Sequence, residues 1–155
     1  MLFSTPGQAI LVAHERRSRL TIVTRTDTLK ADPTAQTLAR MLRALPPNMR
    51  KTITFDNGTE FARHYRLANQ LRIETFFCDP HCPWQKGGVE NAIGRLRRAL
   101  PRKTNLKALS SRAIDSIARA YNHTPRKCLD FQTPAEAFLQ PLHFKCESTH
   151  PLSLG

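Results

Sequence analysis

Short apolar runs near the start of the chain predict two β-strands. Ala9–Ala13 and Leu20–Val23 are apolar, and the polar segment Glu15–Ser18 connects them. Apolar runs of this length on either side of a short polar segment are typical of a β-hairpin. We therefore expect the chain to begin with two antiparallel strands.

A helical period follows the predicted hairpin. Apolar side chains recur at positions i, i+3, i+4 and i+7, which lie on one face of a helix; they are Leu38, Met41, Leu42 and Leu45. Asp32 is the predicted N-cap and Pro33 the first helical residue, because both residue types are favoured at those positions. We expect the pair Pro46–Pro47 to end this helix.

Strand and helix patterns then alternate along the chain. Thr52–Phe55 alternates between polar and apolar residues and runs into a turn sequence, Asp56-Asn57-Gly58. A second helix is expected to bury one side made of Phe61, Tyr65, Ala68 and Leu71. Ile73–Phe77 predicts a further strand, and Pro83–Gly88 predicts a loop with two glycines at its end.

The last part of the chain predicts helices. A basic helix is expected over about Val89–Leu100, and a short one is expected to begin at Thr133. Between them, Ser111–Tyr121 is a predicted helix with a buried stripe formed by Ile114, Ile117, Ala118 and Tyr121. The order strand, strand, helix, strand, helix, strand, helix, helix predicts an α/β fold.

Length and composition fit one globular domain. The chain has 155 residues, of which 40% are apolar and 23% are charged, and such values are typical of a single domain. We assign residues 1–140 to this domain and 141–155 to a loose tail. No apolar run is long enough for a transmembrane helix, and Met1–Gln8 lacks the features of a secretory signal. We expect a cytoplasmic protein.

The charge indicates a polyanionic partner. A net charge of +12 favours nucleic acid first and an anionic membrane surface second. Between Lys86 and Lys103 the one acid is Glu90, so this segment is strongly basic. The candidates for contacts with DNA phosphates are Lys86, Arg95, Arg97, Arg98, Arg102 and Lys103. The alternative interpretation of the segment is a solvated helix face.

Two carboxylates stand at positions that suit chemistry. Asp56 follows a predicted strand, where active-site residues of α/β sheets tend to lie, and Glu90 lies in the first turn of the basic helix. Carboxylates are hard ligands for Mg²⁺ or Mn²⁺, which assist attack on phosphodiesters. Taken singly, Asp56 could simply form a turn, and Glu90 could complement a helix dipole. Cys78–Cys82 has the wrong spacing for a zinc site.

The segments around these acids resemble the DDE transposases and retroviral-type integrases. Thr54–Phe61 resembles the second-aspartate motif of this family. Pro83–Asn91 resembles the glutamate motif, in the form typical of bacterial insertion-sequence transposases with an N-terminal helix-turn-helix. The 33 residues between Asp56 and Glu90 match the spacing of that subgroup.

The resemblance implies an RNase H-like fold, with a mixed sheet flanked by helices. It also implies a three-carboxylate site for two Mg²⁺ or Mn²⁺ ions, in which Asp56 is the second ligand and Glu90 the third. The implied reactions are 3′-end hydrolysis at transposon ends and strand transfer into target DNA by a nucleoid-associated homo-oligomer. No small-molecule substrate or membrane partner is implied. The matching motif residues without an assigned role are Asn57, Gly58, Trp84, Gln85 and Asn91.

The first aspartate of the family pattern has no match in this chain. It is expected on the strand before Ala9–Ala13, but no acid precedes Glu15. We therefore expect a truncated first strand, a sheet short of one partner, and a chain that is inactive or nearly so. The alternatives are a non-catalytic DNA-binding remnant of a decayed transposase and a poorly folded fragment without function.

Overall fold

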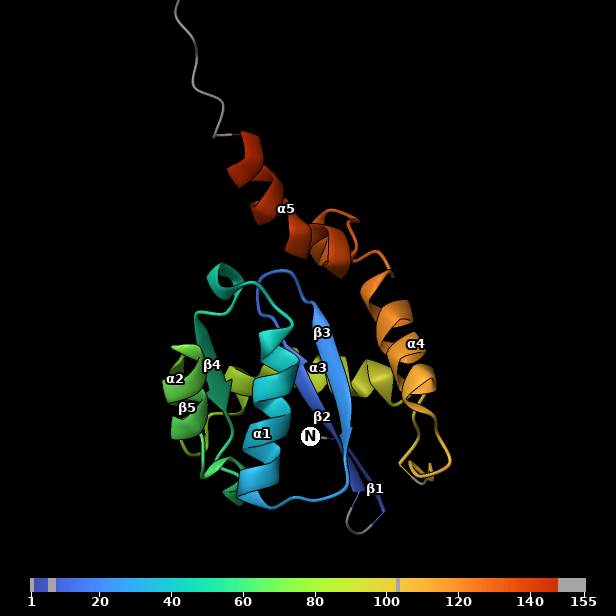
Figure 1. Ribbon diagram of the computed structural model, residues 1–155. Helices are drawn as coiled ribbons and strands as arrows, with labels where there is room; N and C mark the ends of the chain where they lie inside the picture. The colour runs from blue at the N-terminus through green and yellow to red at the C-terminus, as the bar shows by residue number, and fades with distance from the viewer. Residues whose placement is uncertain (1, 6–7, 103, 148–155) are drawn as a thin grey trace, which may run out of the picture.

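The computed structural model describes residues 2–5, 8–102 and 104–147 and has a mixed α/β architecture (Figure 1). In chain order, its strands and α-helices are β1 (Leu2–Thr5), β2 (Gln8–His14), β3 (Thr21–Thr26), α1 (Ala31–Arg43), β4 (Thr52–Phe55), α2 (Tyr65–Leu71), β5 (Glu74–Phe77), α3 (Gly87–Leu96), α4 (Ser111–Asn122) and α5 (Pro134–Glu147). The predicted α/β class is thereby confirmed.

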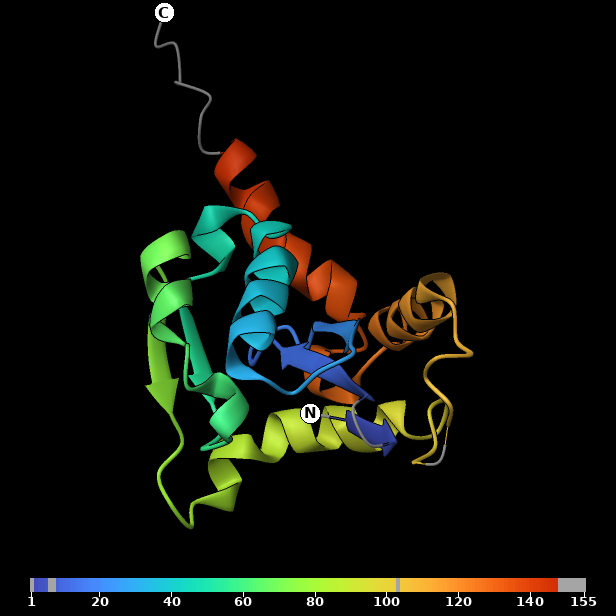
Figure 2. The same cartoon turned by 60° about the horizontal axis from the view of Figure 1, so that its bottom comes forward.

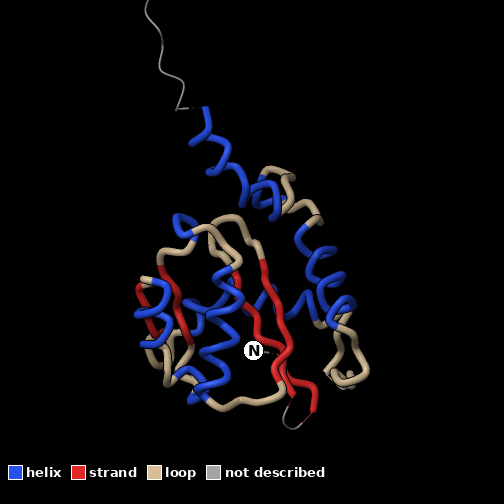
Figure 3. The backbone as a smooth tube through the Cα atoms, viewed as in Figure 1, coloured by secondary structure: helices blue, strands red, loops and turns tan. Residues whose placement is uncertain are grey.

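The strands form two small sheets rather than one. In the first sheet, β2 pairs antiparallel with both β1 and β3, which confirms the predicted hairpin. In the second sheet, β4 and β5 pair in parallel. Figure 3 shows the two groups of strands apart from one another. The single mixed sheet implied by the family resemblance is therefore not formed by the described residues.

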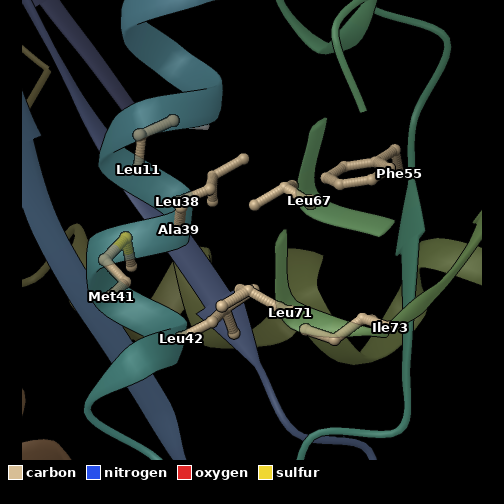
Figure 4. Packing of buried hydrophobic residues seen from close by; sticks show 9 residues of the cluster. All are labelled: Leu11, Leu38, Ala39, Met41, Leu42, Phe55, Leu67, Leu71 and Ile73. Carbon is tan, nitrogen blue, oxygen red and sulfur yellow. The ribbon is translucent and has the colours of Figure 1, made fainter. Parts of the chain in front are cut away.

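Helix α1 connects the two sheets through a shared core. Leu38 and Leu42 of α1 pack with Leu11 of β2 on one side and with Phe55 of β4 on the other (Figure 4). The predicted apolar face of this helix is confirmed, because Leu38, Met41 and Leu42 are all buried. Full burial of each such side chain contributes about 1.5–3 kcal/mol.

A second core lies on the other face of the hairpin. Ile10 and Val23 pack there against Leu96 of α3 and Ile114 of α4. Since Ile10 and its neighbour Leu11 belong to different cores, β2 is buried on both faces, as the alternation of a strand requires. Figure 2 shows α3 running beneath the hairpin toward α4.

The predicted N-cap of α1 is wrong. The helix begins at Ala31, and its N-cap is Lys30, which provides no side-chain cap. Asp32 lies in the first turn instead, where its carboxylate is 3.4 Å from Arg63 Nε and 3.3 Å from Arg66 Nη1. This position still places a negative charge at the positive end of the helix dipole.

The predicted apolar side of the second helix is confirmed only in part, because Leu71 is buried and Phe61 packs against the same core, whereas Tyr65 does not. The segment breaks into a 3₁₀ turn at Thr59–Phe61 and the helix α2, which buries Leu67 and Leu71. Tyr65 is 42% exposed. Phe61 and Tyr65 therefore do not share one helix face, because the three residues between them are not helical.

Two further boundaries differ from the predictions. Pro83–Lys86 forms a 3₁₀ turn, and both glycines of the predicted loop belong to α3, which ends at Leu96 rather than Leu100. Helix α5 continues through Pro141 to Glu147, although the sequence shows no helical pattern there. Residues 148–155 of the predicted tail lie outside the described residues.

Side-chain hydrogen bonds fasten the C-terminal helices to the hairpin. Asn122, at the end of α4, accepts a 2.9 Å hydrogen bond from the backbone N–H of Thr21 and donates a 2.8 Å bond to its carbonyl. Arg25 of β3 donates to the carbonyls of Leu106 and Leu109 at 3.2 and 3.1 Å. These contacts fix α4 and the segment before it against β3.

Replacing Asn122 with alanine should lower the free energy of unfolding by about 2 kcal/mol, because both backbone groups of the fully buried Thr21 lose their partner. Urea denaturation measures this change. Asn69→Ala is the matched control, because Asn69 is exposed on α2. Equal stability of the two variants would contradict the role of Asn122.

Candidate active site and nucleic-acid interface

Asp56 lies directly beyond the end of the parallel strand pair. The last residue of β4, Phe55, is buried and stacks on Phe61 with ring centroids 4.8 Å apart. Beyond β5, the N–H of Cys78 donates a 2.8 Å hydrogen bond to the Phe55 carbonyl. Asn57 then donates through Nδ2 to the Cys78 carbonyl at 3.0 Å. The turn that carries Asp56 is thus tied to the chain leaving β5.

The segment from Cys78 to Lys86, here called the 78–86 loop, is held at its other end as well. Gln85 accepts a hydrogen bond from the N–H of Asp79 and donates one to the Asp79 carboxylate, both at 2.8 Å. The sequence marked Asn57 and Gln85 as motif residues without a role. The structure shows that both form structural hydrogen bonds. Asn57 links the turn after β4 to Cys78, and Gln85 links the two ends of the 78–86 loop.

The two oxygens of the Asp56 carboxylate have different surroundings. Its Oδ2 lies 4.0 Å from the ammonium of Lys86, in a pair of partly exposed side chains. Such a pair contributes at most about 1 kcal/mol. Its Oδ1 is buried and has no hydrogen-bond donor. A buried carboxylate oxygen without a donor fits a hard divalent cation.

Glu90 is exposed in the first turn of α3, four residues after Lys86. Two carboxylates bind to each other only through a shared cation or proton, so a common metal ion for Asp56 and Glu90 stays a prediction. Within the part of the chain that the structure describes, no cluster of three or more His, Cys, Asp or Glu residues could hold a metal ion. The residues that the structure does bring together are Asp56 and Lys86.

A cavity of about 790 Å³ opens beside Asp56. Residues 11–14 of β2 line one side of it, and residues 52–55 of β4 line the other. The cavity therefore occupies the gap between the two sheets. Besides Asp56 and Glu15, its charged lining is basic and consists of Arg16, Arg17, Arg19, Arg50, Lys51 and Lys86. This cavity is called the cationic groove below.

Gly88 allows α3 to approach the end of β2. A Cβ atom on Gly88 would lie 3.3 Å from the imidazole of His14. His14 bonds through Nδ1 to the Thr21 hydroxyl at 3.0 Å, while its Nε2 is buried without a partner. Burial, followed by the positive charge of Arg19, lowers the pKa of His14 from 6.5. The neutral imidazole is thus the favoured form at this contact.

The basic helix presents only part of its predicted DNA-binding set to solvent. Arg95, Arg98 and Arg102 are exposed, and Arg95 donates to Asn91 Oδ1 at 3.3 Å. Arg97 is half-buried, and its Nε is buried without a partner. Lys103 lies outside the described residues. Trp84, in the 3₁₀ turn before α3, is 74% exposed.

These features define an α/β domain with a cationic groove beside a strand-end aspartate. None of the helices that the structure describes has the length and apolar character needed to cross a membrane. No family model matches the chain.

The chain matches transposases over most of its length. It is 37% identical over 134 residues to the transposase for insertion sequence element IS1086 of Cupriavidus metallidurans, covering 86% of this chain and 40% of that protein. It is 35% identical over 136 residues to the transposase InsI of IS30A from Escherichia coli K12, covering 88% and 36%. For the transposase of IS4351 from Bacteroides fragilis, identity is 34% over 132 residues, covering 85% and 40%.

Over these residues the chain is homologous to insertion-sequence transposases, as its motifs indicated. It spans between 36% and 40% of the length of these relatives.

Lowering the pH below 6.5 should destabilise the fold through His14. The unfolded chain binds a proton on this residue near pH 6.5, whereas the folded chain resists protonation, because its pKa is lowered. The free energy of unfolding should therefore fall as the pH drops below 6.5, and His14→Gln should reduce that slope. Urea denaturation at several pH values measures it.

His81→Asn is the control for this series, because His81 is exposed and asparagine tolerates its positive φ of 61°. An unchanged pH slope in His14→Gln would show that His14 does not cause it.

Proposed function

We propose that the chain is the catalytic-core part of a DDE-type transposase, acting on transposon ends and target DNA. The observation that carries this proposal is the unsatisfied, buried Oδ1 of Asp56 at the edge of a cationic groove. A DNA phosphate needs nearby positive charge, and a divalent cation needs a free carboxylate oxygen. The groove offers both at one strand end, and the transposase homology agrees with this chemistry.

In this proposal Asp56 and Glu90 hold Mg²⁺ or Mn²⁺. When bound, such an ion polarises the phosphodiester and activates the attacking oxygen, and a complete site of this class holds two ions. Lys86 neutralises phosphate charge near Asp56, and the exposed Arg95 of α3, with Arg98 and Arg102 after the helix, holds the backbone of the DNA. Water is the nucleophile for 3′-end hydrolysis, and the resulting 3′-hydroxyl is the nucleophile for strand transfer. A homo-oligomer on paired DNA ends belongs to the same proposal.

We also propose an RNase H-like arrangement for the complete domain. The antiparallel hairpin and the parallel pair lie on either side of the groove, with α1 across one face. A chain segment that continues the β1 edge along residues 11–14 of β2 would lie beside β4, join the two sheets into one mixed sheet and could bring a third carboxylate to Asp56. No acid precedes Glu15 in this sequence. We propose that the 155 residues alone therefore have little or no catalytic turnover.

Strand transfer by the 155-residue chain should stay at background with Mg²⁺ or Mn²⁺, because two carboxylates cannot position a metal pair. The assay joins a labelled DNA duplex with a free 3′-hydroxyl end to a plasmid. A joined product that requires Mg²⁺ and disappears in Asp56→Ala would contradict the proposed inactivity. It would at the same time support the catalytic assignment of Asp56.

A second candidate function is DNA binding without catalysis, as in a remnant of a decayed transposase. The exposed cations of α3 and of the segment after it favour this function, because they need no metal to bind phosphates. The two functions differ in their dependence on metal ions. Binding alone requires only the positive surface and weakens steeply with salt.

The double variant Arg98→Ala/Arg102→Ala should bind duplex DNA several-fold more weakly at low salt. It should also reduce the slope of log affinity against log salt by about 2, because two phosphate contacts are lost. Fluorescence anisotropy with a labelled duplex measures both quantities. The control, Lys30→Ala/Arg40→Ala, removes two exposed cations of the α1 region. Equal slopes for the two double variants would place the DNA elsewhere.

A further inference from the structure

Trp84 is a large apolar side chain that the fold does not use. It is the single tryptophan of the chain and is 74% exposed. Leaving an indole in water forgoes a substantial hydrophobic gain. Neither core includes this residue. Its exposure therefore suggests a role in contact with another molecule.

The backbone on both sides of Trp84 is fixed. The N–H of Gly87 donates to the Trp84 carbonyl, and the N–H of Gln85 donates to the Cys82 carbonyl at 3.2 Å. The side chain of Gln85 also holds Asp79, as described above. The indole is thus presented on a pinned loop rather than on a free one, which lowers the entropy lost on binding.

The surroundings of Trp84 select an anionic partner with a flat aromatic surface. Trp84 lines the cationic groove together with Lys86, whose ammonium is 4.0 Å from Asp56. Six Lys or Arg residues line this groove against two carboxylates, Asp56 and Glu15. An apolar peptide would gain nothing from these cations. A nucleotide combines a phosphate for the cations with a base for the indole.

We propose that Trp84 is a stacking platform for an unpaired nucleobase of DNA whose backbone passes Lys86 and Asp56 at the strand-end edge of the groove. This inference rests on the proposed function and adds a subsite to it. An indole stacks on any base, because every base has a π-face, but only where the base has left the duplex. The ligand is therefore a DNA end with unpaired nucleotides rather than a continuous duplex.

Trp84 also supplies the readout, since all tryptophan fluorescence of the chain comes from this side chain. The experiment compares three DNAs at low salt: a blunt duplex, the same duplex with a three-nucleotide overhang, and that overhang with abasic sugars. The overhang with bases should quench the fluorescence and protect the indole from acrylamide. It should also bind about 5- to 150-fold more tightly than the abasic overhang, the range for stacking on one base.

Trp84→Ala should bind the normal and abasic overhangs equally while keeping the salt-dependent affinity for the blunt duplex. Trp84→Phe should restore part of the preference, because a phenyl ring also stacks. Phe131→Ala is the matched control, since Phe131 is 72% exposed outside the groove, and it should behave like the unaltered chain.

Equal quenching by all three DNAs would overturn the proposal and leave the proposed function standing. If Trp84→Ala still bound the normal overhang more tightly than the abasic one, the stacking proposal would also be overturned, and the proposed function would again stand. An indole already protected from acrylamide before DNA is added would indicate a protein contact instead and would also overturn it. Failure of the chain to bind any of the DNAs would overturn the proposed function together with the stacking site.

Discussion

The parallel pairing of β4 with β5 is the constraint on which the candidate site depends. Parallel strands end at the same edge of their sheet, so the residues that follow them emerge side by side. The hydrogen bond from Cys78 to Phe55 extends this pairing beyond the strands, and Asn57 adds a second bond to Cys78. As a result, Asp56 and the 78–86 loop are held as one unit, although 21 residues lie between Asp56 and the start of the loop.

The ammonium of Lys86 has two possible anionic partners at this edge, the Asp56 carboxylate and a DNA phosphate. Lys86 lies close enough to Asp56 to compete weakly with a divalent cation, and it is also placed to meet a phosphate. DNA that draws the ammonium away would leave the carboxylate free for a metal ion. The proposed metal site and the proposed DNA site are therefore coupled through one lysine. The coupling is modest, because both side chains are partly exposed.

Much of the fold could be predicted from local patterns. The hairpin, the buried face of α1, the strand Thr52–Phe55 and the helix α4 all follow from apolar periodicity, because each is a continuous element. The predictions failed where an element breaks or depends on tertiary contacts. The prediction for Tyr65 is wrong because the helix is interrupted before α2 begins. The helical course beyond Pro141 has no signal in the sequence.

The candidate site could be predicted only in part, for the same physical reason. Residue types and spacing singled out Asp56, Glu90 and the basic segment that begins at Lys86, and the structure places Lys86 beside Asp56. The structural hydrogen bonds of Asn57 and Gln85 have partners far along the chain or across a loop, and no local sequence pattern predicts them.

The most direct test is a titration of the ¹⁵N-labelled chain with Mn²⁺, followed by paramagnetic broadening of its amide signals. The account predicts that the signals of Asp56 and Asn57 and those of Glu90 and Asn91 broaden together at the lowest Mn²⁺ concentration. Excess Mg²⁺ should reverse the effect, and Asp56→Asn should abolish it. Broadening at Asp56 that leaves Glu90 sharp, or broadening that persists in Asp56→Asn, would contradict a shared metal site.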